Sequence, residues 1–288
     1  MRVLILGAGG MLGHKVWEVF RDRFDCRAAM RTRLPLALFD DERVIDGFDA
    51  ANFDGVKKLI AKIEPDVVVN CIGVVKQLAA AHDPIASITL NSLFPHIVAR
   101  ACAEAGARMI HISTDCVFAG TCGHYREDDV PDDADLYGRS KLLGEVTEGA
   151  LTIRTSIIGR ELRTSNGLVE WFLSNRGGSV RGFTNAIFSG VTTAMLARIL
   201  AAVIEQHPGM HGLYHVAGAA ISKYDLLMML NAAMGAGVMI APDDTVVIDR
   251  SLDATLFQAV TGLQPPEWLE MIAALAAESP QYERWRTE

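Results

Sequence analysis

Two side chains in the stretch "YGRSK" have types and a spacing that suit proton transfer. Tyr137 and Lys141 are four residues apart, so in a helix both lie on one face, one turn apart. A phenol has a pKa of about 10, and a nearby ammonium group favours its phenolate form. The pair can therefore give a proton to an alkoxide as it forms, while the lysine also binds a cofactor ribose. Surface Tyr–Lys pairs share this spacing, so its meaning depends on the surrounding fold.

A third candidate group lies in "HISTDCVF", residues 111–118. An apolar run over residues 109–112 stops at Ser113, Thr114 and Asp115, as expected where a buried strand ends. Thr114 would then lie at the carboxyl edge of the sheet, where open α/β folds bind ligands. Its hydroxyl can bond the same oxygen that Tyr137 protonates. Asp115 is either a ligand-binding group or the cap of the following turn.

The motif "GAGGMLG" places glycines three residues apart, directly after the first apolar run. Such glycines allow a tight turn, a close backbone approach to a pyrophosphate and close helix packing, and the helix end attracts the anion. A ligand-free turn between a strand and a helix is the alternative. We expect a dinucleotide to contact Gly7, Gly10, Met11, Leu12 and Gly13.

The end of the second predicted strand, "MRTR", indicates which dinucleotide is preferred. An acidic residue there would hold the ribose 2′-hydroxyl of NAD, but the sequence has Arg31 and Arg33. A guanidinium group suits the 2′-phosphate of NADP, so we expect NADPH through Arg31, with NADH as the second choice. Two solvated loop arginines are the alternative. After the fourth strand, small residues should lie against the cofactor, namely Cys71, Ile72 and Gly73.

The elements that must position these groups alternate along the chain. Apolar runs predict strands over residues 3–6, 26–30, 44–46, 67–71, 109–113, 151–156 and 213–216. Helical periodicity covers residues 11–24, 52–63, 85–105, 136–148, 167–175 and 192–205. This order predicts an α/β fold, a Rossmann-type doubly wound parallel sheet with a smaller C-terminal substrate lobe. We expect the NAD(P)-binding domain over residues 1–160, with 186–217 returning to it, and the substrate lobe over 161–185 and 218–288.

Composition excludes several other classes. The 288 residues are 50% hydrophobic, carry a net charge of −8 and contain no Lys/Arg-rich run, so we expect no nucleic-acid partner. The N-terminal apolar run is too short for a signal peptide or a membrane span. Five scattered cysteines without CxxC spacing, and histidines without ligand spacing, indicate reduced thiols, a cytoplasmic protein and no metal site.

Together these motifs resemble the dTDP-4-dehydrorhamnose reductase family, within the extended short-chain dehydrogenases/reductases. The resemblance runs nearly from end to end, through "GAGGMLG", "HISTDCVFAG", "YGRSKLLGE", "IRTSIIG", "GLYHVAG" and "LDATLFQAVTGLQPPEW". It implies reduction of a nucleotide-linked 4-keto-6-deoxy sugar, in deoxysugar and polysaccharide biosynthesis, with NADPH or NADH. Thr114, Tyr137 and Lys141 match the family's catalytic positions, and Asp115 matches an aspartate beside the substrate.

The partner implied is a nucleotide diphosphate sugar, with a homodimer left open. The diphosphate needs a cation, and four residues are candidates: Lys76, Arg163, Arg176 and Arg181. The chain also departs from the family pattern. Cys116 replaces the usual Tyr after Thr-Asp, and Ile157 and Ile158 replace a bulkier pair after "RTS". These positions line the sugar site in the family, so the identity of the sugar stays open.

Three other functions are alternatives to the reductase. A dehydratase of this superfamily has Asp-Glu after the threonine, and here Cys116 follows Asp115, which disfavours dehydration. A nucleotide-sugar epimerase would also use Thr, Tyr and Lys. A non-catalytic NADP-binding regulatory subunit is the third alternative, and the intact set of Thr114, Tyr137 and Lys141 argues against it.

Overall fold

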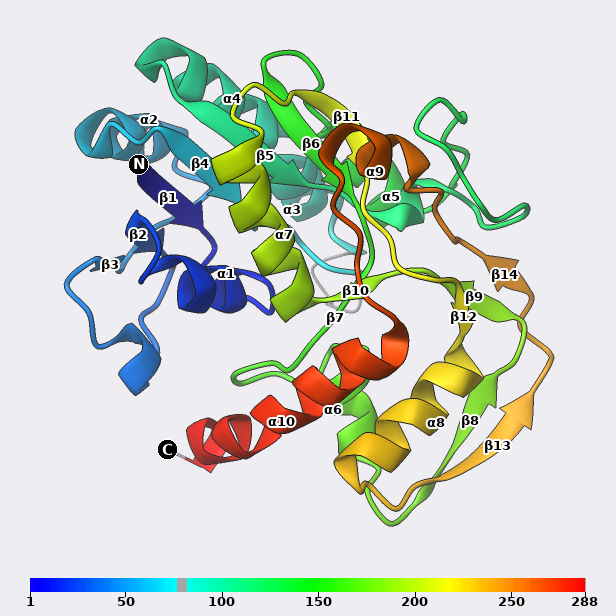
Figure 1. The fold of residues 1–288 in the computed structure, drawn as a ribbon. Coiled ribbons are helices and arrows are strands. Elements are labelled where there is room, and N and C mark those ends of the chain that lie inside the picture. The colour runs from blue at the N-terminus through cyan, green and yellow to red at the C-terminus, as the bar shows by residue number, and fades with distance from the viewer. Residues whose placement is uncertain (77–81, 288) are drawn as a thin grey trace.

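The computed structural model describes residues 1–76 and 82–287 and is built around one parallel sheet (Figure 1). Its seven strands follow the order β3-β2-β1-β4-β5-β6-β11, and every neighbouring pair is parallel. The strands are β1 (Arg2–Leu6), β2 (Asp25–Ala29), β3 (Val44–Ile45), β4 (Val67–Asn70), β5 (Arg108–Ile112), β6 (Ala150–Arg154) and β11 (Gly212–His215). The strand order reverses at β1, so the loops after β1 and β4 meet where such sheets bind ligands.

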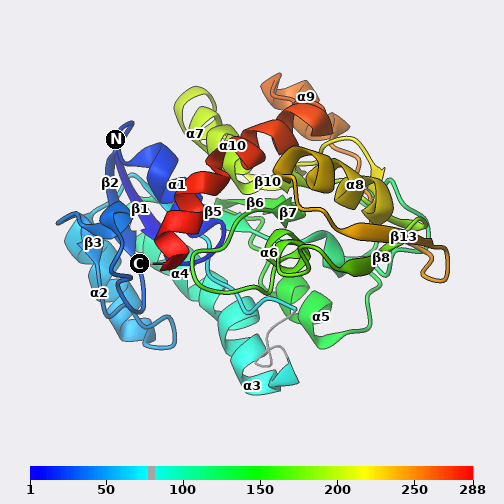
Figure 2. The same cartoon turned by 90° about the horizontal axis from the view of Figure 1, so that it is seen from below.

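Helices cover both faces of this sheet, as the predicted doubly wound fold requires (Figure 2). On one face α1 (Gly13–Phe20) packs against α7 (Thr193–Gln206), and on the other α2 (Phe53–Ile63) packs against α4 (Phe94–Ala105). Strand residues alternate between the two cores: Val3 and Ile5 belong to one, and Leu4 and Leu6 to the other. Both faces are thus buried, which explains the continuously apolar strands.

Shorter strands and helices form the rest of the molecule. The paired strands are β7 (Ile157–Ile158) with β10 (Val191–Thr192), β8 (Ser179–Phe183) with β13 (Met239–Asp243), and β9 (Ala186–Phe188) with both β12 (Ile221–Ser222) and β14 (Ile248–Asp249). The helices are α6 (Leu168–Leu173), α8 (Lys223–Met234), α9 (Thr255–Thr261) and α10 (Trp268–Thr287). Helix α10 returns to the sheet domain, where Tyr282 hydrogen-bonds His14 of α1.

The helix predicted over residues 85–105 is present without a gap, but it is not α-helical throughout. It is divided into α3 (Pro84–Ser87), the π-helical turn η3 (Ile88–Leu93) and α4. Pro95 has no N–H to give to the carbonyl of Asn91, so a regular α-helical ladder cannot pass this point. The Asn91 carbonyl packs against Gly144 instead. A side chain at position 144 would place its Cβ atom only 1.8 Å from this carbonyl oxygen, so the contact requires glycine.

Other predicted helices are shorter than expected. The helix predicted over residues 136–148 is α5 (Leu136–Leu143), which ends at Gly144. The helix predicted over residues 11–24 begins only at Gly13 and ends at Phe20. The described residues also form the 3₁₀ turns η1 (Ala37–Phe39) and η4 (Asp115–Val117). Among the described helices, none has the length and apolar character that crossing a bilayer requires.

Candidate active site

The glycine loop after β1 is tightly folded against its neighbours. Gly7 has φ of +88°, and a Cβ atom there would lie 2.7 Å from Cγ1 of Ile72. A Cβ atom at Gly13 would lie 2.1 Å from the carbonyl oxygen of Gly7. Leu12 precedes α1 and provides no side-chain cap. No side chain therefore covers the positive end of α1, although the His14 N–H already bonds the Gly10 carbonyl at 3.1 Å, and the loop fits the pyrophosphate of a dinucleotide.

Side chains next to this loop complete one edge of the site. The Leu12 side chain is buried in the core, so only its backbone is placed to contact a ligand. The Met11 sulfur lies 3.3 Å from the position that a Cβ atom of Gly167 would take. Cys71 donates its backbone N–H to Leu6, and Ile72 packs against Gly7, so the loops after β1 and β4 are in contact.

Thr114 lies just beyond β5, at the carboxyl edge of the sheet. Its backbone is extended, and its hydroxyl oxygen accepts the N–H of Cys116 at 3.1 Å, so Thr114 caps the turn η4. The same hydroxyl donates to the Asp115 carboxylate at 3.1 Å. The capping role weighed for Asp115 belongs to Thr114, and the Asp115 side chain is left for another contact. Burial raises the pKa of Asp115.

Tyr137 stands in the first turn of α5, which Asp135 caps by accepting the N–H of Gly138 at 2.7 Å. A Cβ atom at Gly138 would lie 2.2 Å from the Cys116 carbonyl oxygen. The glycine after the tyrosine thus lets α5 approach η4 closely enough to bring the phenol to Thr114. Burial raises the pKa of Tyr137, and a hydrogen bond with Thr114 partly offsets the rise. The expectation that Lys141 lowers this pKa is wrong, because burial has the larger effect and the pKa rises.

Lys141 lies on the same side of α5, between the ends of β5 and β4. Its ammonium donates to the Ile112 carbonyl at 2.7 Å, and it lies 3.8 Å from the position that a Cβ atom of Gly73 would take. Burial lowers the pKa of Lys141 to about 8, with Glu145 and Cys71 opposing the shift. The "NCIG" segment and the "YGRSK" helix therefore meet around this ammonium group.

Asn91 is a positioning residue that the sequence did not reveal. Its side-chain oxygen accepts the N–H of Val74 at 2.8 Å, and its amide donates to the Val74 carbonyl and the Ser140 hydroxyl, both at 3.1 Å. This buried residue of the π-helical turn links the loop after β4 to α5. The only sequence signal was Pro95, four residues on, which could have indicated an irregular turn.

A second unpredicted residue, Lys223, faces Asp115 from the first position of α8. Burial lowers the pKa of Lys223 to about 8, while the charge of Asp115 opposes the shift. The Lys223 charge in turn lowers the pKa of Asp115 against the effect of burial. Lys223 comes from the C-terminal third of the chain, so nothing near "HISTDCVF" could have indicated it.

The two arginines after β2 have different surroundings. Arg33 points back into its own loop, donating to the carbonyl of Phe39 at 3.4 Å and to that of Val44. Arg31 is exposed, and none of the described residues forms an ion pair with it. Arg31 is therefore the guanidinium group left for a ligand at this edge.

The candidate cations for the diphosphate are mostly paired. Lys76 donates to Asp135 at 2.5 Å, Arg181 pairs with Asp243 at 2.9 Å, and Arg176 pairs weakly with Glu283 at 3.7 Å. Arg163 is exposed without an ion pair in the part of the chain that the structure describes. The Lys76 pair also ties the loop after β4 to the cap of α5, so Lys76 has a structural contact beside any role in binding.

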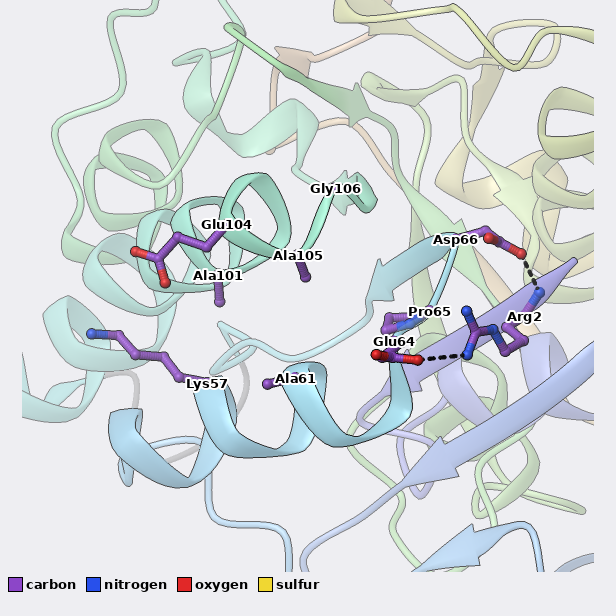
Figure 3. Close-up of a pocket in the computed structure, with 10 residues that line it drawn as sticks. All are labelled: Arg2, Lys57, Ala61, Glu64, Pro65, Asp66, Ala101, Glu104, Ala105 and Gly106. Atoms are coloured by element: carbon purple, nitrogen blue, oxygen red, sulfur yellow. Dashed lines mark hydrogen bonds and ion pairs between the residues drawn. The ribbon is translucent and has the colours of Figure 1, made fainter.

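A surface cavity of about 480 Å³ lies at the opposite, amino edge of the sheet, between α2 and α4 (Figure 3). Its arginine, Arg2, is already bonded to Glu64 and Asp66. Reacting groups in this fold gather at the carboxyl edge, so this cavity is separate from the candidate site. Within residues 1–76 and 82–287, His, Cys, Asp and Glu form no group of three that could hold a metal ion.

Curated proteins with similar sequences align with between about half and most of this chain. Methionine adenosyltransferase 2 subunit beta of Bos taurus is 32% identical over 166 residues, covering 56% of this chain and 48% of the relative. The chain thus spans about half the length of the curated relatives it matches first. The dTDP-4-dehydrorhamnose reductase of Mycolicibacterium smegmatis is 29% identical over 245 residues, covering 82% of this chain and 70% of that protein.

Solved structures share the fold over almost the whole chain. The dTDP-4-dehydrorhamnose reductase of Bacillus anthracis, crystallised in complex with NADP, superimposes with a TM-score of 0.81 at 24% identity. The match covers 96% of this chain and 99% of that one. The family described as the RmlD substrate binding domain matches residues 1–279. With that match, and with the loop, strand ends and helix described above, the chain belongs to the RmlD substrate binding domain family.

Proposed function

We propose that this protein reduces the 4-keto group of a nucleotide-activated 6-deoxy sugar, with NADPH as the reductant. The observation that supports the proposal is that the Tyr137 phenol lies at the Thr114 hydroxyl and the Lys141 ammonium at the Ile112 carbonyl, both at the carboxyl edge of β5, where the loop after β4 packs against the glycine loop. These groups are the ones a carbonyl reduction needs next to a dinucleotide. The reductase from M. smegmatis and the NADP-bound reductase from B. anthracis support the same conclusion.

In this proposal each side chain has a separate task. Bound NADPH supplies a hydride for the carbonyl carbon. Tyr137 is held as the neutral phenol by burial, so it has a proton to give to the carbonyl oxygen. Thr114 orients that oxygen through its hydroxyl. Lys141 binds the nicotinamide ribose and stabilises the phenolate that remains, while Gly7, Gly10 and Gly13 leave room for the pyrophosphate.

The expected domain division, cellular location and homodimer are consistent with this reaction. Residues 1–160 and 186–217 would form the cofactor domain, and residues 161–185 and 218–288 the lobe that binds the sugar nucleotide. All five cysteines are unpaired, which supports a cytoplasmic location. A homodimer would cover exposed apolar side chains on neighbouring elements, Ile85 and Ile88 on α3 and η3 and Leu143 on α5.

The reaction is tested with purified protein and a panel of 4-keto-6-deoxy nucleotide sugars, by following the loss of reduced-cofactor absorbance. We expect turnover of at least one dTDP- or UDP-linked sugar. Turnover of simple aldehydes without any nucleotide sugar would contradict the substrate class. The panel also identifies the sugar, which the replacements at Cys116, Ile157 and Ile158 leave open.

Two alternative functions have their own signatures. An epimerase retains its nicotinamide cofactor through purification, so tightly bound NAD in the isolated protein would favour that function. The likeness to methionine adenosyltransferase 2 subunit beta raises a regulatory role instead. A protein that binds NADPH but oxidises it with no keto sugar would favour that regulatory role.

Replacing Arg31 with Ala should weaken NADPH binding about tenfold and leave NADH binding unchanged, since a hydrogen bond to a charged phosphate is worth about 1.5–3 kcal/mol. Unmodified protein should correspondingly bind NADPH more tightly than NADH. Fluorescence titration of both cofactors measures this. Arg33→Ala is the control, because its guanidinium bonds backbone carbonyls and its loss should not discriminate between the cofactors. Equal affinity for both cofactors in the unmodified protein would contradict the role of Arg31.

The affinity for NADPH should fall about tenfold between pH 7 and pH 9. Burial lowers the pKa of Lys141 to about 8, so its ammonium is protonated below pH 8 and loses its charge above it. A neutral amine donates weaker hydrogen bonds to the ribose than the ammonium does. Titrations of NADPH across this range measure the effect. In Lys141→Met the affinity should be lower but constant over the same range, and an equally steep decline there would assign the titration to another group.

A further inference from the structure

Lys223 is placed at the site by the pairing of two short strands. Strand β12 pairs antiparallel with β9, which sets Ile221 opposite Phe188. Ser222 then caps α8, its hydroxyl oxygen accepting the N–H of Asp225 at 3.0 Å. Lys223 follows as the first residue of α8, and its ammonium lies 3.8 Å from the centre of the Phe188 ring. The aromatic face favours the cation, and its position does not depend on a carboxylate neighbour.

The surroundings of this ammonium group are unusual for a lysine. Burial lowers its pKa to about 8, yet no carboxylate of the described residues lies within the 4.0 Å of an ion pair. Strand β9, which carries Phe188, also pairs with β14, and Arg250 just beyond β14 donates to the Phe118 carbonyl at 2.7 Å. This small sheet therefore packs against the end of η4, and the charges of Asp115 and Cys116 act on the ammonium from there. Lys223 is only partly buried, so a ligand can reach its ammonium group. That group carries three N–H donors, and the ring of Phe188 satisfies none of them as a full hydrogen bond.

We propose that Lys223 and Asp115 together bind one hydroxyl group of the sugar, on the carbon next to the reacting carbonyl. This inference rests on the proposed function and names a contact within its substrate site. A hydroxyl is both donor and acceptor, so it can accept from the ammonium and donate to the carboxylate at the same time. Asp115 directly follows Thr114, which holds the reacting oxygen, so the hydroxyl belongs to a neighbouring carbon.

The charges also decide against the diphosphate as the group bound here. The negative charge of Asp115 would repel an anionic phosphate, and the other cation acting on Asp115, Arg250, is already paired with Asp133 at 2.8 Å. A neutral hydroxyl group is not repelled by the carboxylate and can donate a hydrogen bond to it. Lys223 therefore acts in recognising the sugar, whereas the diphosphate must find its cations elsewhere.

Lys223→Met tests the contact while keeping the length and apolar contacts of the side chain. With the best keto sugar of the panel, its KM should rise about 10- to 100-fold, with the Kd for NADPH unchanged and kcat lowered less than fivefold. Asp115→Asn should raise the same KM, and the double variant should cost less than the product of the two single effects, because both residues bind one group. Lys57→Met, on α2 at the opposite edge, is the matched control and should change nothing. An unchanged KM in Lys223→Met would overturn the inference.

A second measurement separates this inference from the proposed function. The Kd values of dTDP-glucose and of dTDP are measured by calorimetry with NADP⁺ present, for the unmodified protein and for Lys223→Met. The sugar should tighten binding in the unmodified protein, and most of that gain should be lost in the variant. Failure to reduce any keto sugar, with this difference intact, would refute the reductase but not the sugar contact. An identical ratio of the two Kd values in both proteins would refute the contact.

Discussion

Tyr137→Phe should lower turnover by a factor of about 10² to 10⁴, the usual contribution of a positioned proton donor. The substitution removes one oxygen atom from a side chain whose burial keeps it protonated, and it leaves the aromatic packing in place. The Kd for NADPH should stay within twofold, because the phenol has no assigned contact with the cofactor. Steady-state kinetics with the best sugar of the panel and a cofactor titration measure the two quantities.

The matched control is Tyr214→Phe. Tyr214 is a partly buried residue of β11 that packs against Phe257, away from the candidate site. It should keep full turnover, which would show that the loss in Tyr137→Phe does not come merely from removing the hydroxyl of a partly buried tyrosine. A Tyr137→Phe protein that reduced its sugar at a near-normal rate would refute the proton transfer, whatever its family membership.

Gly13→Ala should abolish high-affinity cofactor binding, with a loss of about 100-fold or more in affinity for NADPH. Its Cβ atom would lie 2.1 Å from the Gly7 carbonyl oxygen and 2.9 Å from the Cα atom of Ala8. These neighbours are backbone atoms, so the loop itself must shift, and a shift of about 1 Å in a binding geometry is enough to cost that much. The crowding should also cost about 1–3 kcal/mol of stability, measurable as a lower Tm.

Gly9→Ala provides the control for stability in the same loop. A Cβ atom there would meet only the Met30 side chain at 3.9 Å, which is ordinary contact. Its Tm should match that of the unmodified protein. Unchanged NADPH affinity and Tm in Gly13→Ala would show that the loop can accommodate the methyl group, and would contradict a requirement for glycine at this position.

Local sequence was sufficient to predict the central sheet, the glycine loop and the helix that carries Tyr137 and Lys141. Runs such as "VVV" at residues 67–69 are too apolar and too β-branched for a surface strand, so a sheet buried on both faces followed from them. The glycine spacing required a strand before it and a helix after it, and β1 and α1 supply both. The four-residue step from Tyr137 to Lys141 likewise fixed their common helix face, because that geometry depends only on the helix itself.

Contacts between distant segments were decided by the tertiary structure alone. Pro95 shows where the helical ladder fails, but only packing against Gly144 determines that Asn91 turns toward the loop after β4. Helix propensity likewise could not show that Gly138 lets α5 approach η4. The pKa of Tyr137 depended on how deeply the phenol is buried, which outweighs the lysine four residues on. Lys223 is the clearest case: its ammonium lies over Phe188, where the charge of Asp115 acts on it, because β12 pairs with β9. Strand pairing between distant segments has no periodic signal in the chain.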